Sequence, residues 1–144
     1  MDIESISPAM EVEERSKLEL PLFISKVHAG SPTPADDYFD NKLDLNDYLV
    51  TKPSHTYFVK VSGDSMVGAG IFPGDTLVVD RSLSAEHNKI VIAMIENEFI
   101  VKRLKIHNGS VYLISENSKY PPLEVTDPDM MIWGVVTYTI HKPR

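Results

Sequence analysis

The chain has 144 residues, of which 42% are apolar, so it can bury a core and is unlike a globally disordered protein. Its formal net charge is −7, which argues against direct binding to nucleic-acid phosphates. It has no cysteine, which excludes disulfide bonds and thiolate metal sites.

The first 29 residues read as a polar, acidic arm. Its concentrated apolar residues lie between Leu18 and Ile24, which we expect to pack as an extended strand. An acidic start without a long apolar run is unlike a signal peptide, and no window is long enough for a membrane span, so we expect a cytoplasmic protein. Gly30 and two prolines then break any regular element over residues 29–34.

Residues 35–49 are predicted to form a short helix, with Asp36 and Asp37 in its first turn. From Thr56 onward, short apolar runs separated by turn residues predict a compact, mainly β domain. The expected strands are 57–61, 76–80, 89–95, 98–106, 111–115 and 131–141. Glu96-Asn97 is the expected turn of a tight hairpin.

Ser65 lies in the motif Ser-Gly-Asp-Ser65-Met66, directly after the strand predicted over 57–61. A lone serine beside glycine is usually a turn residue. Here a short helix is expected to follow it, and backbone amides near such a turn can hold a developing oxyanion. We expect the amides of Asp64 and Ser65 to be those donors.

Lys102 lies in the predicted strand 98–106, where alternation places it with Ile100 and Leu104 on the more apolar face. An isolated lysine there usually extends its ammonium group to solvent. A serine, however, needs an adjacent base, and a lysine can serve if burial keeps it neutral. The two residues together therefore predict a Ser-Lys hydrolase. The five histidines form no metal-ligand pair with nearby carboxylates, and no phosphate-binding loop is present, so no metal or cofactor is expected.

Five segments together resemble the LexA/UmuD family of self-cleaving Ser-Lys peptidases. They are Val61-Ser-Gly-Asp-Ser65-Met66, Pro73-Gly-Asp75, Ile90-Val-Ile-Ala93, Phe99-Ile-Val-Lys102-Arg103-Leu104 and Gly134-Val-Val136. The resemblance implies a LexA-like peptidase β-fold, with Ser65 as nucleophile, Lys102 as general base and Ala29-Gly30 as the bond that is cut. It also implies three parts: an arm over 1–29 that self-cleavage removes, a linker and short helix over 30–50, and a peptidase and dimerisation domain over 51–144.

Among the family's members, the UmuD-like branch fits best, because a short acidic arm rather than a helix-turn-helix domain precedes Ala29-Gly30. This resemblance implies a homodimer of the SOS DNA-damage response. A RecA filament on single-stranded DNA would stimulate cleavage, and the product would join a UmuC-like Y-family DNA polymerase in translesion synthesis. No membrane and no sequence-specific DNA binding are expected. The alternatives are a repressor-type regulator that acts by dimerisation and protein binding, and a processing peptidase that acts on other chains.

Overall fold

The computed structural model describes residues 1–8, 19–23, 29–30 and 39–144. The chain divides into two compact units. One unit joins Met1–Glu11 to Lys52–Arg144, and the other is Val12–Thr51. The division of the chain into an arm, a linker and a peptidase domain concerns what self-cleavage would release, and it stays a prediction.

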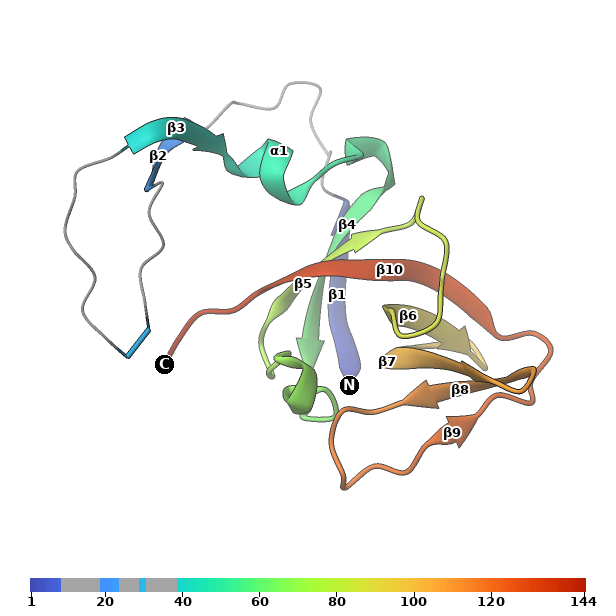
Figure 1. Ribbon diagram of the computed structural model, residues 1–144. Coiled ribbons are helices and arrows are strands. Elements are labelled where there is room, and N and C mark those ends of the chain that lie inside the picture. Colours follow the sequence, from blue (N-terminus) through green and yellow to red (C-terminus); the bar gives the residue numbers. More distant parts are fainter. Residues whose placement is uncertain (9–18, 24–28, 31–38) are drawn as a thin grey trace. The chain divides into compact units, whose positions relative to one another are not determined.

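An antiparallel β-sheet forms the first unit, so the predicted mainly β fold class is confirmed (Figure 1). In the order of pairing, its strands are β1 (Asp2–Pro8), β4 (Thr56–Ser62), β5 (Thr76–Asp80), β10 (Met131–Ile140), β6 (Ile90–Ile95), β7 (Glu98–His107), β8 (Ser110–Ile114) and β9 (Leu123–Glu124). Because Asp2 of β1 also pairs with Ile100 of β7, the strands from β1 to β7 close into a barrel. This closing contact joins the two outermost of the six strands at the start of β1.

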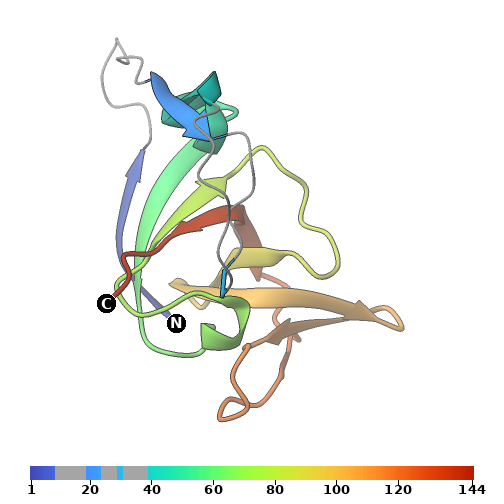
Figure 2. The same cartoon turned by 60° about the vertical axis from the view of Figure 1, so that its left-hand side comes forward.

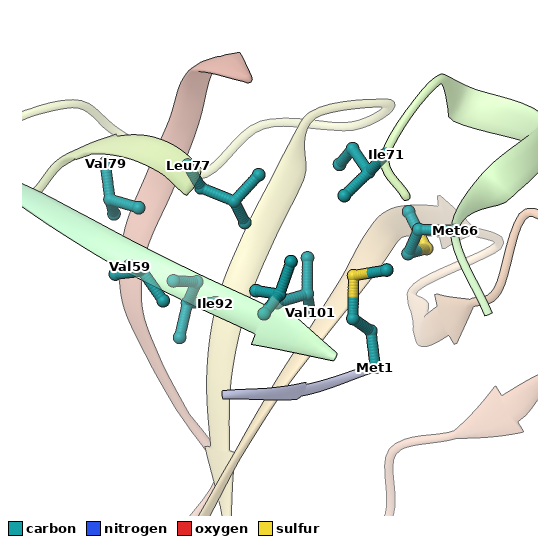
Figure 3. Close-up of a cluster of buried hydrophobic side chains, with 9 residues drawn as sticks. Met1, Val59, Met66, Ile71, Leu77, Val79, Ile92 and Val101 are labelled. Atoms are coloured by element: carbon teal, nitrogen blue, oxygen red, sulfur yellow. The ribbon is translucent and has the colours of Figure 1, made fainter. Parts of the chain in front are cut away.

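Two clusters of buried apolar side chains support this barrel. Figure 3 shows the larger cluster, which consists of Met1, Val59, Val61, Met66, Ile71, Leu77, Val79, Ile92 and Val101. The smaller cluster consists of Val91, Ala93, Leu104, Leu113 and Val135. Successive residues of β6 fall in different clusters, so both faces of this strand are covered. This explains why its sequence is a continuous apolar run rather than an alternating one.

Strand β1 corrects the expectation that residues 1–29 are simply a polar arm. Residues 2–8 pair with β4 along their whole length, as the view in Figure 2 also shows. Ile3 and Ile6 both pack against the larger cluster. An irregularity in register between Ile3 and Ser5 lets two side chains at an odd spacing face the same core. That spacing hides the strand from a search for strict alternation.

The second unit contains an antiparallel pair, β2 (Glu19–Phe23) and β3 (Phe39–Asp44), followed by helix α1 (Leu45–Leu49). The helix predicted over 35–49 is therefore wrong for residues 39–44, where pairing with β2 sets a strand. Its first residues, 35–38, lie outside the described part of the chain. Asp44 caps α1 by accepting a hydrogen bond from the Asn46 amide at 2.9 Å, which explains where the helix begins.

Candidate active site

Ser65 lies in the turn between β4 and a short 3₁₀ helix, Val67–Ala69, and it is 1% exposed. The predicted order of strand, turn and short helix is confirmed here. Gly68 lets this turn approach the chain closely, because a Cβ atom at that position would lie 2.6 Å from the Glu116 carbonyl oxygen. The Gly68 amide donates a hydrogen bond to the same oxygen at 2.8 Å. The turn that carries Ser65 is thus fastened to the segment that follows β8.

Lys102 lies on β7 and is partly buried. Burial lowers the pKa of its ammonium group below the ordinary value, and the charge of Asp2 opposes this shift. Its neighbour Val101, on the opposite face of β7, is fully buried in the larger cluster. A lowered pKa increases the fraction of neutral amine at a given pH, which is the form that can accept a proton.

Ser115 is a residue of the candidate site that the sequence analysis did not select. It is buried, it follows β8 directly, and its hydroxyl accepts a hydrogen bond from Lys102 Nζ. The antiparallel register between β7 and β8 brings the two side chains together, since Arg103 pairs with Ile114. The sequence feature that could have indicated Ser115 is the tight turn between β7 and β8, because such a turn fixes which residues of the two strands face each other.

The segment after β8 also holds Asp64, the residue that precedes Ser65. Asn117 Nδ2 donates to the Asp64 carbonyl oxygen at 2.9 Å, and the Tyr120 hydroxyl donates to the Asp64 carboxylate at 2.6 Å. The hydrogen bond from Tyr120 lowers the pKa of the Asp64 carboxyl group, and the same contact raises the pKa of Tyr120. The ring of Tyr120 lies 5.5 Å from Lys102 Nζ. One segment therefore contacts both predicted catalytic regions.

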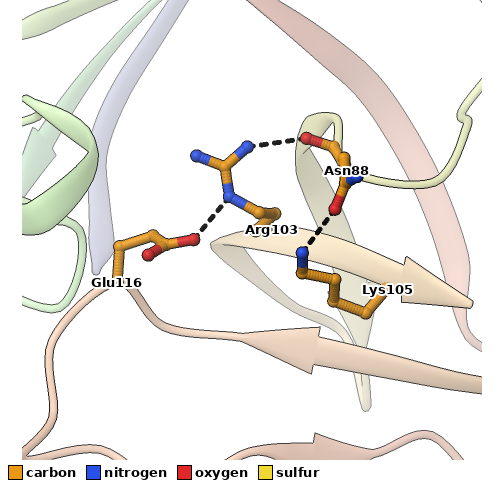
Figure 4. Close-up of polar contacts among 4 residues, drawn as sticks. All are labelled: Asn88, Arg103, Lys105 and Glu116. Carbon is orange, nitrogen blue, oxygen red and sulfur yellow. Dashed lines mark hydrogen bonds and ion pairs between the residues drawn. The ribbon is translucent and has the colours of Figure 1, made fainter.

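Arg103 strengthens this connection on the other face of β7 (Figure 4). Its Nε atom donates to the Glu116 carboxylate at 2.5 Å, and one of its terminal nitrogens donates to the Asn88 carbonyl oxygen at 2.6 Å. Lys105 donates to the Asn88 side chain. Arg103 thus ties the Ser115–Glu116 segment to β7 and to the loop before β6.

The α-amino group of Met1 is the group that contacts the Ser65 hydroxyl. It donates a hydrogen bond to Ser65 Oγ at 2.6 Å, and the Met1 side chain is buried. Burial lowers the pKa of this amino group, and the charge of Lys102 lowers it further. The Met1 amino group therefore interacts with both predicted catalytic residues, by a hydrogen bond with Ser65 and by charge repulsion with Lys102.

The remaining predicted site residues stay predictions. Ala29 and Gly30 lie in an exposed turn, and Gly30 has a φ of +88°, a conformation that favours glycine. They belong to the second unit, while Ser65 and Lys102 belong to the first. The oxyanion role of the Asp64 and Ser65 amides likewise stays a prediction. Within the described residues, no cluster of three or more metal-ligating side chains occurs. No helix in the same part of the chain has the length and apolar character to span a membrane.

Known proteins similar to this chain show its family. The Peptidase S24-like family model matches residues 21–137. Protein MucA of Salmonella typhimurium is 45% identical over 124 residues, which cover 84% of each chain. Protein ImpA of Shigella flexneri is 42% identical over 86% of this chain and 85% of its own. The LexA repressor of Alcanivorax borkumensis is 38% identical over 88% of this chain and 61% of its own. The chain therefore belongs to the Peptidase S24-like family, as a UmuD-like member of its LexA/UmuD group.

Proposed function

We propose that this chain is a self-cleaving Ser-Lys endopeptidase of the SOS DNA-damage response. The observation that carries the proposal is that one segment, residues 115–120, contacts both the turn of buried Ser65 and the strand of partly buried Lys102. Membership of the Peptidase S24-like family supports a serine peptidase.

In the proposed reaction, neutral Lys102 accepts the proton of the Ser65 hydroxyl while Ser65 Oγ attacks the carbonyl carbon of Ala29. The amides of Asp64 and Ser65 stabilise the resulting oxyanion. When the bond to Gly30 breaks, the departing nitrogen receives the proton from Lys102, and water then hydrolyses the acyl-serine. The products are residues 1–29 and residues 30–144.

We further propose that a RecA filament on single-stranded DNA stimulates this cleavage. The trimmed chain, as a homodimer in the cytoplasm, would then serve as accessory subunit of a UmuC-like Y-family polymerase in translesion synthesis. The acidic net charge of −7 supports contact with DNA through partner proteins rather than directly. Similarity to MucA and ImpA supports the UmuD-like assignment on which these partners depend.

Mass spectrometry of the purified chain tests the cleavage. We expect fragments 1–29 and 30–144 to appear with RecA, ATP and single-stranded DNA, and to appear slowly at pH 10 without them. Samples that lack single-stranded DNA at neutral pH are the matched control. If the chain stays intact under both stimuli, the peptidase proposal fails. Co-purification of fragment 30–144 with a Y-family polymerase, compared with the intact chain, tests the partner separately.

Ser115 is proposed to position Lys102. Ser115→Ala removes the hydroxyl that accepts from Lys102 Nζ, so we expect cleavage to slow about 10- to 100-fold, which is less than the roughly 10²- to 10⁴-fold that general-base catalysis contributes, because the base itself stays in place. Ser115→Thr keeps a hydroxyl and should retain most of the activity. The pH dependence of cleavage is the second measurement, because a base that has lost its partner titrates differently. A Ser115→Ala chain with the wild-type rate and pH profile would contradict this role.

A further inference from the structure

The slot between β4 and β7 is occupied by the chain's own first residues. Strand β1 pairs with β4 from Asp2 to Pro8 and reaches β7 at Ile100. These two strands are the ones that lead to Ser65 and carry Lys102. An extended peptide that adds to sheet edges gains affinity from main-chain hydrogen bonds and specificity from the pockets for its side chains. Residues 1–8 are bound in this way beside the candidate nucleophile.

The Met1 side chain supplies an apolar anchor for this binding. It is 7% exposed and belongs to the same buried cluster as Met66 and Val101, as Figure 3 shows. Ser65 lies between Met66 and the end of β4 in the chain. Because the Met1 amino group also contacts Ser65 Oγ, the site that the Met1 side chain fills lies close to the Ser65 hydroxyl.

The α-amino group of Met1 adds a chemical argument. Its nitrogen lies 2.6 Å from Ser65 Oγ. In hydrolysis of a peptide bond by a serine, the departing nitrogen becomes a free α-amino group next to the serine oxygen. The docked β1 strand therefore presents to Ser65 the same group, at the same kind of distance, as a newly formed product N-terminus.

We propose that β1 is an autoinhibitory strand, and that the slot between β4 and β7 binds a peptide with a free α-amino group and an apolar first side chain. Its occupant is residues 1–8 of this chain. The claim that a docked β1 blocks cleavage rests on the proposed function of Ser65. The claim that the slot binds residues 1–8 does not rest on it. While β1 is docked, another segment cannot reach Ser65, so the fraction of chains with β1 displaced limits the rate of cleavage.

A peptide-binding experiment tests the slot without any cleavage. The probe is the synthetic peptide Met-Asp-Ile-Glu-Ser-Ile-Ser-Pro, labelled at its C-terminus, with the α-amino group either free or acetylated. We expect the free peptide to bind a chain from which residues 2–8 have been deleted. The acetylated peptide should bind this chain at least about tenfold more weakly, since it lacks the charged group that donates to Ser65. The intact chain should bind neither, because its slot is filled. Equal binding of the two peptides would overturn the proposal.

A point variant of the full chain covers the case in which the shortened chain fails to fold. Ile6 is half-buried against the core, so Ile6→Asp should loosen β1, whereas Ser7→Asp places the same charge at an exposed neighbouring position. We expect hydrogen exchange of the Thr56–Ser62 amides to be at least about tenfold faster in Ile6→Asp than in Ser7→Asp. Equal exchange in the two variants would contradict a displaceable strand.

Cleavage of the same two variants separates the inference from the proposed function. If Ile6→Asp is cut faster than Ser7→Asp, β1 is autoinhibitory. If both are cut at the wild-type rate although β4 exchanges faster in Ile6→Asp, autoinhibition is wrong. If no variant is cut under any stimulus, the peptidase proposal fails, while the peptide-binding and exchange results still decide whether the slot exists.

Discussion

Replacing Ser65 with Ala is expected to abolish the appearance of fragments 1–29 and 30–144, with a fall in rate of at least about 10³-fold. The physical reason is that alanine offers no oxygen to attack the Ala29 carbonyl carbon. Mass spectrometry over a long incubation with the RecA filament measures the loss. Because Ser65 is buried and accepts a hydrogen bond from the Met1 amino group, thermal unfolding must confirm that the Ser65→Ala chain is still folded.

Ser84→Ala is the matched control for this variant. Ser84 is exposed in the loop between β5 and β6, so removing its hydroxyl should leave the rate of cleavage unchanged. A Ser65→Ala chain that still breaks between Ala29 and Gly30 would exclude Ser65 as the nucleophile, whatever the behaviour of the control.

Lys102→Met is expected to cause a loss of similar size, because methionine keeps much of the apolar stem of the side chain and removes the amine. Lys105→Met is the matched control on the same strand, where the lysine contacts the Asn88 side chain. Mass spectrometry again measures the product. A fragment yield from Lys102→Met equal to that from Lys105→Met would show that another group accepts the Ser65 proton.

The pH dependence of the wild-type cleavage rate tests the role of Lys102 as the base by a second route. Burial lowers the pKa of Lys102, so its neutral form becomes populated at a lower pH than in a solvent-exposed lysine. Cleavage should therefore rise with pH and level off above this lowered pKa, rather than continue to rise toward that of a free lysine. The Met1 amino group titrates nearby with its own lowered pKa, so N-terminal acetylation distinguishes the two. A profile that is flat from pH 6 to 11 would contradict a lysine base.

The strands of the barrel were largely predictable because their local signals agree with their tertiary surroundings. The segment 76–80 is predicted and observed with the same bounds, and Glu96-Asn97 forms the expected turn with positive φ at both residues. The helix predicted over 35–49 shows where prediction from local sequence patterns fails. Local patterns cannot reveal that residues 39–44 pair with a strand about 20 residues earlier in the chain.

The candidate site was predictable only where its residues carry a chemical motif. Ser65 and Lys102 were found from the residue types that such chemistry needs, although their catalytic roles remain to be tested. Ser115 was missed because a serine at the end of a strand has no distinctive local pattern, and its contact with Lys102 depends on the hairpin register. The position of the Met1 amino group was beyond sequence reasoning, because it depends on which strands close the barrel.

Closure of the barrel by β1 also has a consequence for the order of events during folding. Strand β1 pairs with partners between Tyr57 and Ile100, which lie far from it in the sequence. Contacts so distant in sequence form late, since a long loop must close before they gain anything. A folding chain therefore passes through an interval in which its core is open on one side, and the pairing of β1 closes it.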